Sequence, residues 1–159
     1  MKLLFDEMLG SLARWCRILG IDSAIFKGKS DSQLLDLAKA DCLVLVTRDL
    51  QLAERCGKGG VRHILIKSEK IEEQIAQVLK ESGAVATFPE KTRCASCNGE
   101  LSIVPKASVE GEVEADTFAH HERFWRCKDC KKLFWEGGHW KNIKRIYDKA
   151  KAMLRCPPG

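Results

Sequence analysis

The chain has 159 residues, of which 45% are hydrophobic and 31% charged, and its formal net charge is +5 at pH 7. This composition predicts a globular protein with one ordinary domain, or a smaller domain followed by a module too small to build its own core. The apolar residues 3–5 are followed at once by Asp6 and Glu7, which excludes a signal-peptide core, and no apolar run could span a bilayer. We therefore expect a cytoplasmic protein with no membrane association.

Charge is distributed unevenly along the chain. Residues 1–88 hold 13 Lys and Arg against 12 Asp and Glu, residues 105–122 hold 1 against 5, and residues 123–159 hold 11 against 3. The positive field is concentrated in the last segment. RNA or DNA is a natural partner for it, although a solvated basic face also explains such a cluster.

Apolar spacing in the first half alternates between strand and helix patterns. Strands are expected at residues 2–5, 21–26, 42–46 and 63–66, and helices at residues 9–19, after Ser30, at residues 50–56 and from residue 71 to Gly83. Four such repeats with short connections predict right-handed crossovers and a parallel sheet with helices on both faces. The sequence thus predicts an α/β domain over residues 1–88, followed by a polar linker at residues 89–92.

Two C-x-x-C pairs follow the linker, in the segments RCASC and RCKDC. Each pair can supply two corners of a tetrahedron, so Cys94, Cys97, Cys127 and Cys130 together predict a structural zinc site of the Cys₄ type. The reducing cytosol keeps thiols free, which argues against a disulfide framework in a chain expected there. The 29 residues between Cys97 and Cys127 exceed the usual ribbon spacing, and the acidic segment 105–122 accounts for the excess as an insertion.

From Trp140 onward, apolar residues recur on one helical face while basic residues lie largely on the others. We expect a basic amphipathic helix, which makes residues 93–155 a zinc ribbon with a C-terminal helix.

Acidic side chains fall where the predicted parallel strands end. Asp6 and Glu7 follow the first strand, Asp49 follows the third, and Asp31 lies in the first turn of a helix. Because parallel strands end at one edge of a sheet, these carboxylates are expected to converge, and such a cluster suits Mg²⁺ or Mn²⁺. Asp49 equally fits an N-cap and Asp31 a favourable place in the helix dipole, and both roles can hold together.

Five segments of the chain match a known family in the same order: FDEMLGSLARWCRILG, SDSQLLDLA, VLVTRDLQLA, RCASCNGEL and FWRCKDCKKLFWEGGHW. They resemble the Mut-seven C-terminal RNase family, a PIN-like nuclease domain followed by a zinc ribbon. The resemblance covers nearly the whole chain. It implies a PIN-type acidic site, which carries over to Asp6, Asp31 and Asp49. Glu7, beside Asp6, is a further candidate ligand of the metal, although the family often has other residues at that position.

The function implied by this resemblance is that of a metal-dependent endoribonuclease, a PIN-like hydrolase that cleaves RNA phosphodiester bonds. Asp6 and Asp49 are expected to hold Mg²⁺ or Mn²⁺ directly, and Asp31 to bind the ion or to orient the attacking water. The alternative is a non-catalytic RNA-binding or ribosome-associated zinc-ribbon protein. That alternative predicts salt-sensitive RNA binding that needs no Mg²⁺.

Several basic residues are candidates for contact with RNA. Arg14, Arg17 and Arg48 could hold the scissile phosphate, or could serve as surface charges that screen the acidic cluster. His139 and Trp140 could stack on bases or pack the ribbon against the first domain, and packing is favoured for Trp140. Lys141 and Arg145, on the basic side of the last helix, complete the predicted RNA-binding set.

Overall fold

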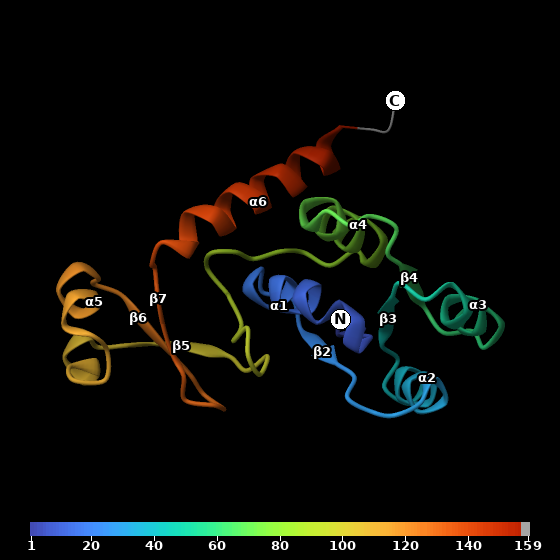
Figure 1. The fold of residues 1–159 in the computed structure, drawn as a ribbon, viewed down its shortest axis with the longest axis horizontal. Coiled ribbons are helices and arrows are strands. Elements are labelled where there is room, and N and C mark those ends of the chain that lie inside the picture. Colours follow the sequence, from blue (N-terminus) through green and yellow to red (C-terminus); the bar gives the residue numbers. More distant parts are fainter. Residues whose placement is uncertain (157–159) are drawn as a thin grey trace.

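A computed structural model describes residues 1–156 of the chain. Its first sheet has four parallel strands in the order β2-β1-β3-β4 (Figure 1). The strands are β1 (Leu3–Phe5), β2 (Ser23–Ile25), β3 (Val44–Thr47) and β4 (His63–Leu65). All four fall within, or within one residue of, the predicted apolar runs, and the predicted parallel α/β architecture is confirmed.

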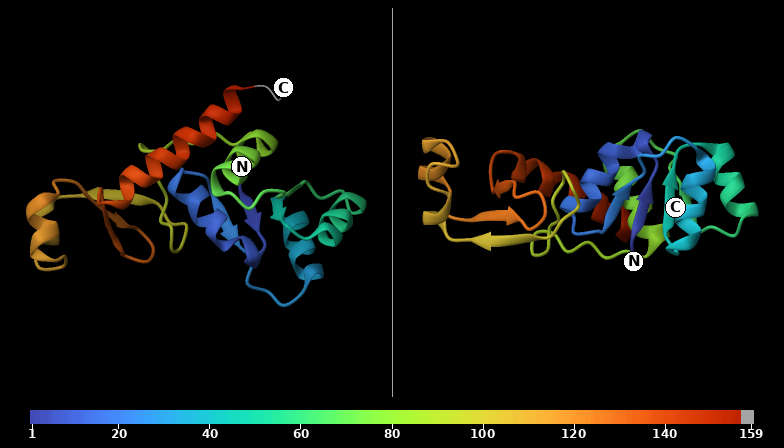
Figure 2. Two further views of the ribbon diagram at one scale, coloured as in Figure 1. Left: turned by 45° about the horizontal axis from the view of Figure 1, so that its top comes forward. Right: turned by 90° about the horizontal axis from the view of Figure 1, so that it is seen from below.

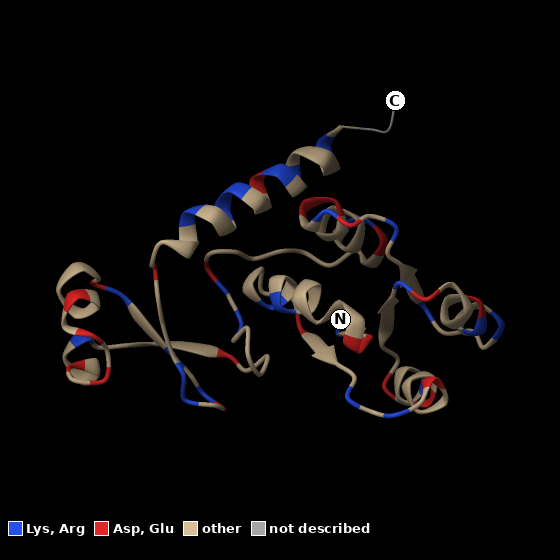
Figure 3. Ribbon diagram, in the orientation of Figure 1, with Lys and Arg blue, Asp and Glu red and all other residues tan. Residues whose placement is uncertain are grey.

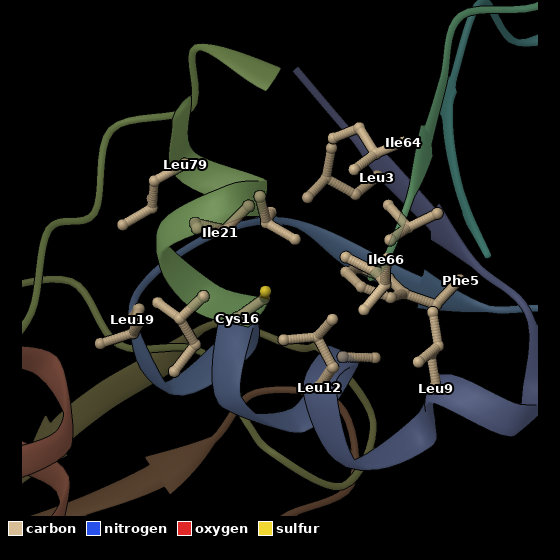
Figure 4. Packing of buried hydrophobic residues seen from close by; sticks show 14 of the residues in the cluster. Leu3, Phe5, Leu9, Leu12, Cys16, Leu19, Ile21, Ile64, Ile66 and Leu79 are labelled. Carbon is tan, nitrogen blue, oxygen red and sulfur yellow. The ribbon is translucent and has the colours of Figure 1, made fainter. Parts of the chain in front are cut away.

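Helices cover both faces of this sheet. Their bounds are α1 (Gly10–Ile18), α2 (Asp31–Ala40), α3 (Leu50–Lys58) and α4 (Ile71–Ser82). Alternation along β1 explains the two layers. Leu3 and Phe5 lie in a core with α1 and α4 (Figure 4), whereas Leu4 lies in a separate core with α2 and α3. Both faces of the strands are therefore buried, as expected of a parallel sheet.

Local signals in the sequence set the helix ends. The Ser30 hydroxyl accepts a hydrogen bond from the Gln33 backbone N–H at 3.3 Å and so caps α2. Gly83 ends α4 in the left-handed conformation, with φ of 75°, which a residue with a side chain adopts only under strain. These two positions explain why the sequence pattern located both helices.

The second sheet is small and antiparallel. It consists of β5 (Leu101–Val104), β6 (Phe124–Cys127) and β7 (Leu133–Trp135), in that order. The acidic insertion between β5 and β6 contains the 3₁₀ helix η2 (Lys106–Val109) and the short helix α5 (Ala115–His120). Figure 2 shows these two helices at the end of the molecule away from the first sheet.

The last helix, α6 (His139–Arg155), leaves the second sheet and packs along α4 (Figures 1 and 2). Ala150 is fully buried in the same core as Leu3, and Phe88 packs against Trp140 and Tyr147 at ring-centroid distances of 4.9 and 5.8 Å. The packing role expected for Trp140 is confirmed. The division into residues 1–88 and 93–155 stays a prediction, and α6 contributes to the core of the first part.

Within residues 1–156, no helix has the length and apolar character needed to cross a membrane.

Candidate functional site

The carboxyl edge of the first sheet brings Asp6 close to the end of β3. Strands β1 and β3 are parallel neighbours with Phe5 opposite Val46, and the Asp6 backbone N–H donates to the Val46 carbonyl at 3.1 Å. Asp6 caps the 3₁₀ helix η1 (Glu7–Leu9), and its Oδ1 accepts from the Met8 N–H at 3.3 Å. Strand register thus fixes the position of this carboxylate.

Thr47 connects the two aspartates that follow β1 and β3. Its side chain is fully buried, and its hydroxyl donates to Asp6 Oδ2 at 3.1 Å. The same Oγ1 accepts from the Asp49 backbone N–H at 3.0 Å. Sequence reasoning did not find this residue, because its role depends on which strand lies beside β3.

Asp49 has the capping role that its position before a helix indicates. Its Oδ1 accepts from the Leu52 N–H at 3.1 Å at the start of α3, and the residue is exposed. The cap uses one carboxylate oxygen, and a carboxylate can accept further bonds or bind a cation through the other. Capping and cation binding are therefore compatible in this side chain.

Asp31 and Glu7 are less closely tied to this pair. Asp31 begins α2, is exposed, and its Oδ2 lies 3.2 Å from Arg55 Nη1 on α3. Glu7 is exposed in η1. Among residues 1–156, only the four-cysteine set brings three or more Cys, His, Asp or Glu ligand atoms within 4.8 Å of one another. Asp6 and Asp49 thus follow neighbouring strands, and the described acidic residues form no compact cluster of three ligand atoms.

Hard oxygen donors at the Asp6 and Asp49 positions fit the chemistry of a Mg²⁺ or Mn²⁺ site. Both carboxylates stand on rigid elements, at the C-terminal ends of adjacent buried strands, where open α/β sheets bind their ligands. Asp31 could join them once it is released from Arg55.

The four predicted zinc ligands do form a compact cluster. The Sγ atoms of Cys94, Cys97, Cys127 and Cys130 all lie within 4.8 Å of one another. Cys94 and Cys130 are 3.6 Å apart at sulfur, and Cys97 and Cys127 are 3.4 Å apart. Tetrahedral Zn²⁺ with bonds of about 2.3 Å requires about 3.8 Å between sulfurs, so the donor set fits this ion.

Each C-x-x-C pair lies in a tight turn that we call a knuckle, the first over residues 94–98 and the second over residues 127–131. The two knuckles have matching backbone geometry. In each, the N–H four residues after the first cysteine donates to that cysteine's carbonyl: Asn98 to Cys94 at 2.8 Å and Lys131 to Cys127 at 3.1 Å. Both donors have positive φ, 70° at Asn98 and 64° at Lys131. The repeated turn aims two sulfurs from each pair at a common point, as a structural metal centre requires.

Arg17 occupies a different place from the phosphate contact expected from the sequence. It is 5% exposed, and its guanidinium donates to the carbonyls of Ser23 at 2.8 Å, Ala95 at 2.9 Å and Ser96 at 3.1 Å. Burial lowers its pKa, an effect that the charge of the nearby cysteines opposes. Arg17 therefore joins the first sheet to the first zinc knuckle. Arg17 follows buried Ala13 by four residues and therefore lies on the buried face of α1. This helical spacing is the signal in the sequence that could have revealed its burial.

The other predicted RNA contacts lie on the surface. Arg14 and Lys141 are exposed, as is His139, whereas Arg48 is half-buried and donates to the Ser68 carbonyl and to Glu69. Arg145 is also exposed and bonds to Asn142 on its own helix. Figure 3 shows basic residues along the length of α6.

Comparison with known families decides the classification. The family model described as the Mut7-C RNAse domain matches residues 1–147. The chain belongs to the Mut7-C RNAse domain family. No curated protein and no solved structure matched the chain.

The Mut7-C match spans the acidic edge, the four-cysteine cluster and half of α6. The family resemblance predicted from the sequence is therefore confirmed. Membership in a Mut7-C RNAse family indicates a nuclease-type function and interaction with RNA.

Proposed function

We propose that this protein is a ribonuclease that hydrolyses RNA phosphodiester bonds at the carboxyl edge of its parallel sheet, with Mg²⁺ or Mn²⁺ bound by Asp6 and Asp49. The observation that carries the proposal is the Thr47 hydroxyl, which bonds to Asp6 Oδ2 and to the Asp49 N–H. This connection ties the Asp6 carboxylate to the backbone of Asp49, so that the two aspartates stand on neighbouring strand ends. Family membership supports the substrate class.

The cation would supply Lewis-acid stabilisation of the phosphate and a lowered pKa for the attacking water. Asp49 would bind it through the oxygen that its cap leaves available, and Asp6 through a remaining lone pair, because both of its oxygens already accept one hydrogen bond. Asp31 would bind the same ion or accept a hydrogen bond from the water, which requires its ion pair with Arg55 to open. Glu7, exposed beside Asp6, is a further candidate ligand at this edge.

Arg14 and Arg48 are the cations proposed to contact the phosphate. Arg14 is exposed on α1, whose first residues follow Asp6 after one turn of 3₁₀ helix. Arg48 is adjacent to Asp49 and is ion-paired with Glu69 at 2.9 Å, so it would have to exchange that partner for phosphate. The four cysteines would hold a structural zinc ion that takes no part in the chemistry.

The test is cleavage of a single-stranded RNA labelled at one end, with Mn²⁺ or Mg²⁺ and with chelator. Wild type is expected to cleave only with the divalent ion, whereas Asp6→Asn and Asp49→Asn are expected to lose at least a hundredfold in rate. Asp36→Asn, an exposed substitution on α2, is the matched control and should retain full activity. The end label also distinguishes internal from terminal cleavage.

Equal cleavage by wild type and both variants would contradict the assignment. Salt-sensitive RNA binding without cleavage in any divalent ion would instead favour the non-catalytic RNA-binding alternative, with the basic face of α6 as the binding surface.

A further inference from the structure

An aromatic cavity lies where α1, the first zinc knuckle, the second sheet and α6 meet. Its volume is about 280 Å³, close to the lower end of the range for ligand pockets. Its wall includes one aliphatic side chain, four large aromatic side chains and one imidazole: Ile18, Trp125, Phe134, Trp135, Trp140 and His139. None of these residues belongs to the acidic edge or to the zinc ligands.

Aromatic side chains make up much of the cavity wall, and little of that wall is polar. Trp125 and Trp140 are nearly parallel, with an interplanar angle of 11° and ring centroids 6.3 Å apart. Trp135 is 38% exposed although it is large and apolar. Flat aromatic walls of this kind are suited to a planar guest, because every nucleobase can stack on them.

One exposed face of α1 connects the cavity to the acidic edge. Ser11, Arg14 and Ile18 are spaced three and four residues apart and so lie on the same side of the helix. Ser11 and Arg14 are exposed, and Ile18 lines the cavity. The nine residues of α1 span about 13 Å, which corresponds to about four nucleotides of a stacked strand.

The charge along this path matches a nucleic-acid backbone. Arg14 stands midway on α1, and Lys141 is exposed two residues after the cavity residue His139. Arg93 also lines the cavity, and its guanidinium donates to the Asn98 carbonyl at 2.8 Å and lies 3.8 Å from the Asp22 carboxylate. An apolar peptide would gain nothing from these cations, whereas a polyanion with planar bases gains from both the charge and the rings.

We propose that this cavity binds one unpaired base of a single-stranded RNA, about four nucleotides from the bond that is cleaved, with Arg14 contacting the backbone between them. The proposal rests on the proposed ribonuclease function for its substrate class. It adds a base-binding subsite separate from the chemistry, and it makes the enzyme select single-stranded RNA long enough to reach both places.

Binding is measured first, with zinc-loaded full-length Asp6→Asn protein in chelator-free buffer without Mg²⁺ or Mn²⁺, so that cleavage does not interfere. The probe is an eight-nucleotide single-stranded RNA, and the comparison probe is an abasic ribose-phosphate oligomer of the same length. Three of the four tryptophans line the cavity, so their fluorescence reports occupancy. We expect quenching by the RNA and at least tenfold weaker quenching by the abasic oligomer.

Phe134→Ala and His139→Ala test the cavity itself. Each is expected to weaken RNA binding, by about tenfold for Phe134→Ala. His139 is exposed, so its removal does not threaten folding, and zinc content checks the fold of Phe134→Ala. The matched control is Ile103→Ala. Ile103 is an exposed apolar residue of the same sheet and lies outside this cavity, so this variant should bind RNA as tightly as the parent protein.

The cleavage assay separates this proposal from the proposed function. In an otherwise wild-type chain, Phe134→Ala should raise KM for the eight-nucleotide RNA about tenfold and leave cleavage of a trinucleotide unchanged. Equal affinity for RNA and the abasic oligomer, or unchanged KM in Phe134→Ala, would overturn the base subsite and leave the ribonuclease assignment standing. Base-dependent quenching in a chain that cleaves nothing would retain the subsite and reject the ribonuclease assignment.

Discussion

The Thr47 hydroxyl donates a hydrogen bond to Asp6 Oδ2 across 41 positions of sequence, at 3.1 Å. This bond exists because β1 and β3 are adjacent and parallel, with Phe5 opposite Val46. It orients the Asp6 carboxylate, while the hydroxyl oxygen accepts a hydrogen bond from the Asp49 N–H. A single buried oxygen therefore contacts the carboxylate of Asp6 and the backbone of Asp49, the two residues of the proposed cation site.

Replacing Thr47 with Val keeps a branched side chain and removes that oxygen. The Asp49 N–H then loses its partner, so we expect the free energy of unfolding to fall by about 1 to 3 kcal/mol and RNA cleavage to fall more than tenfold. Thr47→Ser retains the hydroxyl and should recover most of both. Urea unfolding and the cleavage assay measure the two effects, and wild-type activity in Thr47→Val would contradict the positioning role.

Substitutions at Asp49 separate capping from catalysis. Asn is as good an N-cap as Asp, so Asp49→Asn should leave stability nearly unchanged, whereas Asp49→Ala should lose about 0.5 to 2 kcal/mol through the missing bond to Leu52. Both substitutions should abolish cleavage. If Asp49→Asn cleaves normally while Asp49→Ala is merely unstable, Asp49 is a cap and nothing more.

Arg17→Met is expected to loosen the first zinc knuckle. The substitution removes the donor to three carbonyls, including those of Ala95 and Ser96. The free energy of unfolding should fall by about 1.5 to 3 kcal/mol. Hydrogen exchange should accelerate at the Asn98 amide, which bonds to the Cys94 carbonyl. Arg14→Met, one turn away on the exposed side of α1, is the matched control and should change neither quantity.

Thiol labelling should distinguish three classes of cysteine: exposed cysteines outside the cluster, the four cluster cysteines, and buried cysteines. In zinc-loaded native protein a maleimide is expected to reach only Cys42 and Cys156, which are exposed and outside the cluster. Chelation should add the four cluster cysteines and make residues 93–137 sensitive to protease, because metal binding supplies much of the folding free energy of so small a module.

The remaining two cysteines are expected to react only after unfolding. Burial raises the pKa of Cys16 to about 12 and also raises that of Cys56, so neither forms the reactive thiolate in the folded protein. Mass spectrometry of the labelled chain measures all three counts. Unchanged labelling and protease resistance after zinc removal would reject the structural metal centre.

Glu73 should contribute to stability on the acid side. The Ser68 hydroxyl, at 2.5 Å, and Lys70 lower the pKa of its carboxyl. A lowered folded-state pKa stabilises the protein above the unfolded-state value, and this contribution disappears as the pH falls through the folded-state pKa. Wild type should therefore be more stable than Glu73→Gln at neutral pH, with the two curves converging in acid. A constant difference at all pH values would contradict this linkage.

Patterns that are local in sequence predicted most of the fold. Apolar runs located the parallel strands, Ser30 and Gly83 marked helix ends, and cysteine spacing identified the four-cysteine cluster. The carboxyl-edge placement of Asp6 and Asp49 followed from the expected parallel direction of the strands.

What the sequence did not reveal depends on contacts between distant segments. The role of Thr47 depends on the β1–β3 register, and the ion pair of Asp31 with Arg55 depends on how α2 lies beside α3. Arg17 is basic and was expected at the surface, yet carbonyls supplied from a knuckle 78 residues away make its burial favourable. The aromatic cavity likewise arises only when α6 returns to the first sheet's helices.

The return of α6 sets the order in which a growing chain can fold. Ala150 packs in the core that includes Leu3, so that core is not closed until the ribosome has added residue 150. A nascent chain of about 90 residues has its acidic edge but leaves the α1 and α4 side uncovered, and Arg17 still lacks the carbonyls of Ala95 and Ser96. The domain that carries the acidic edge thus reaches its finished form only after this helix has been synthesised.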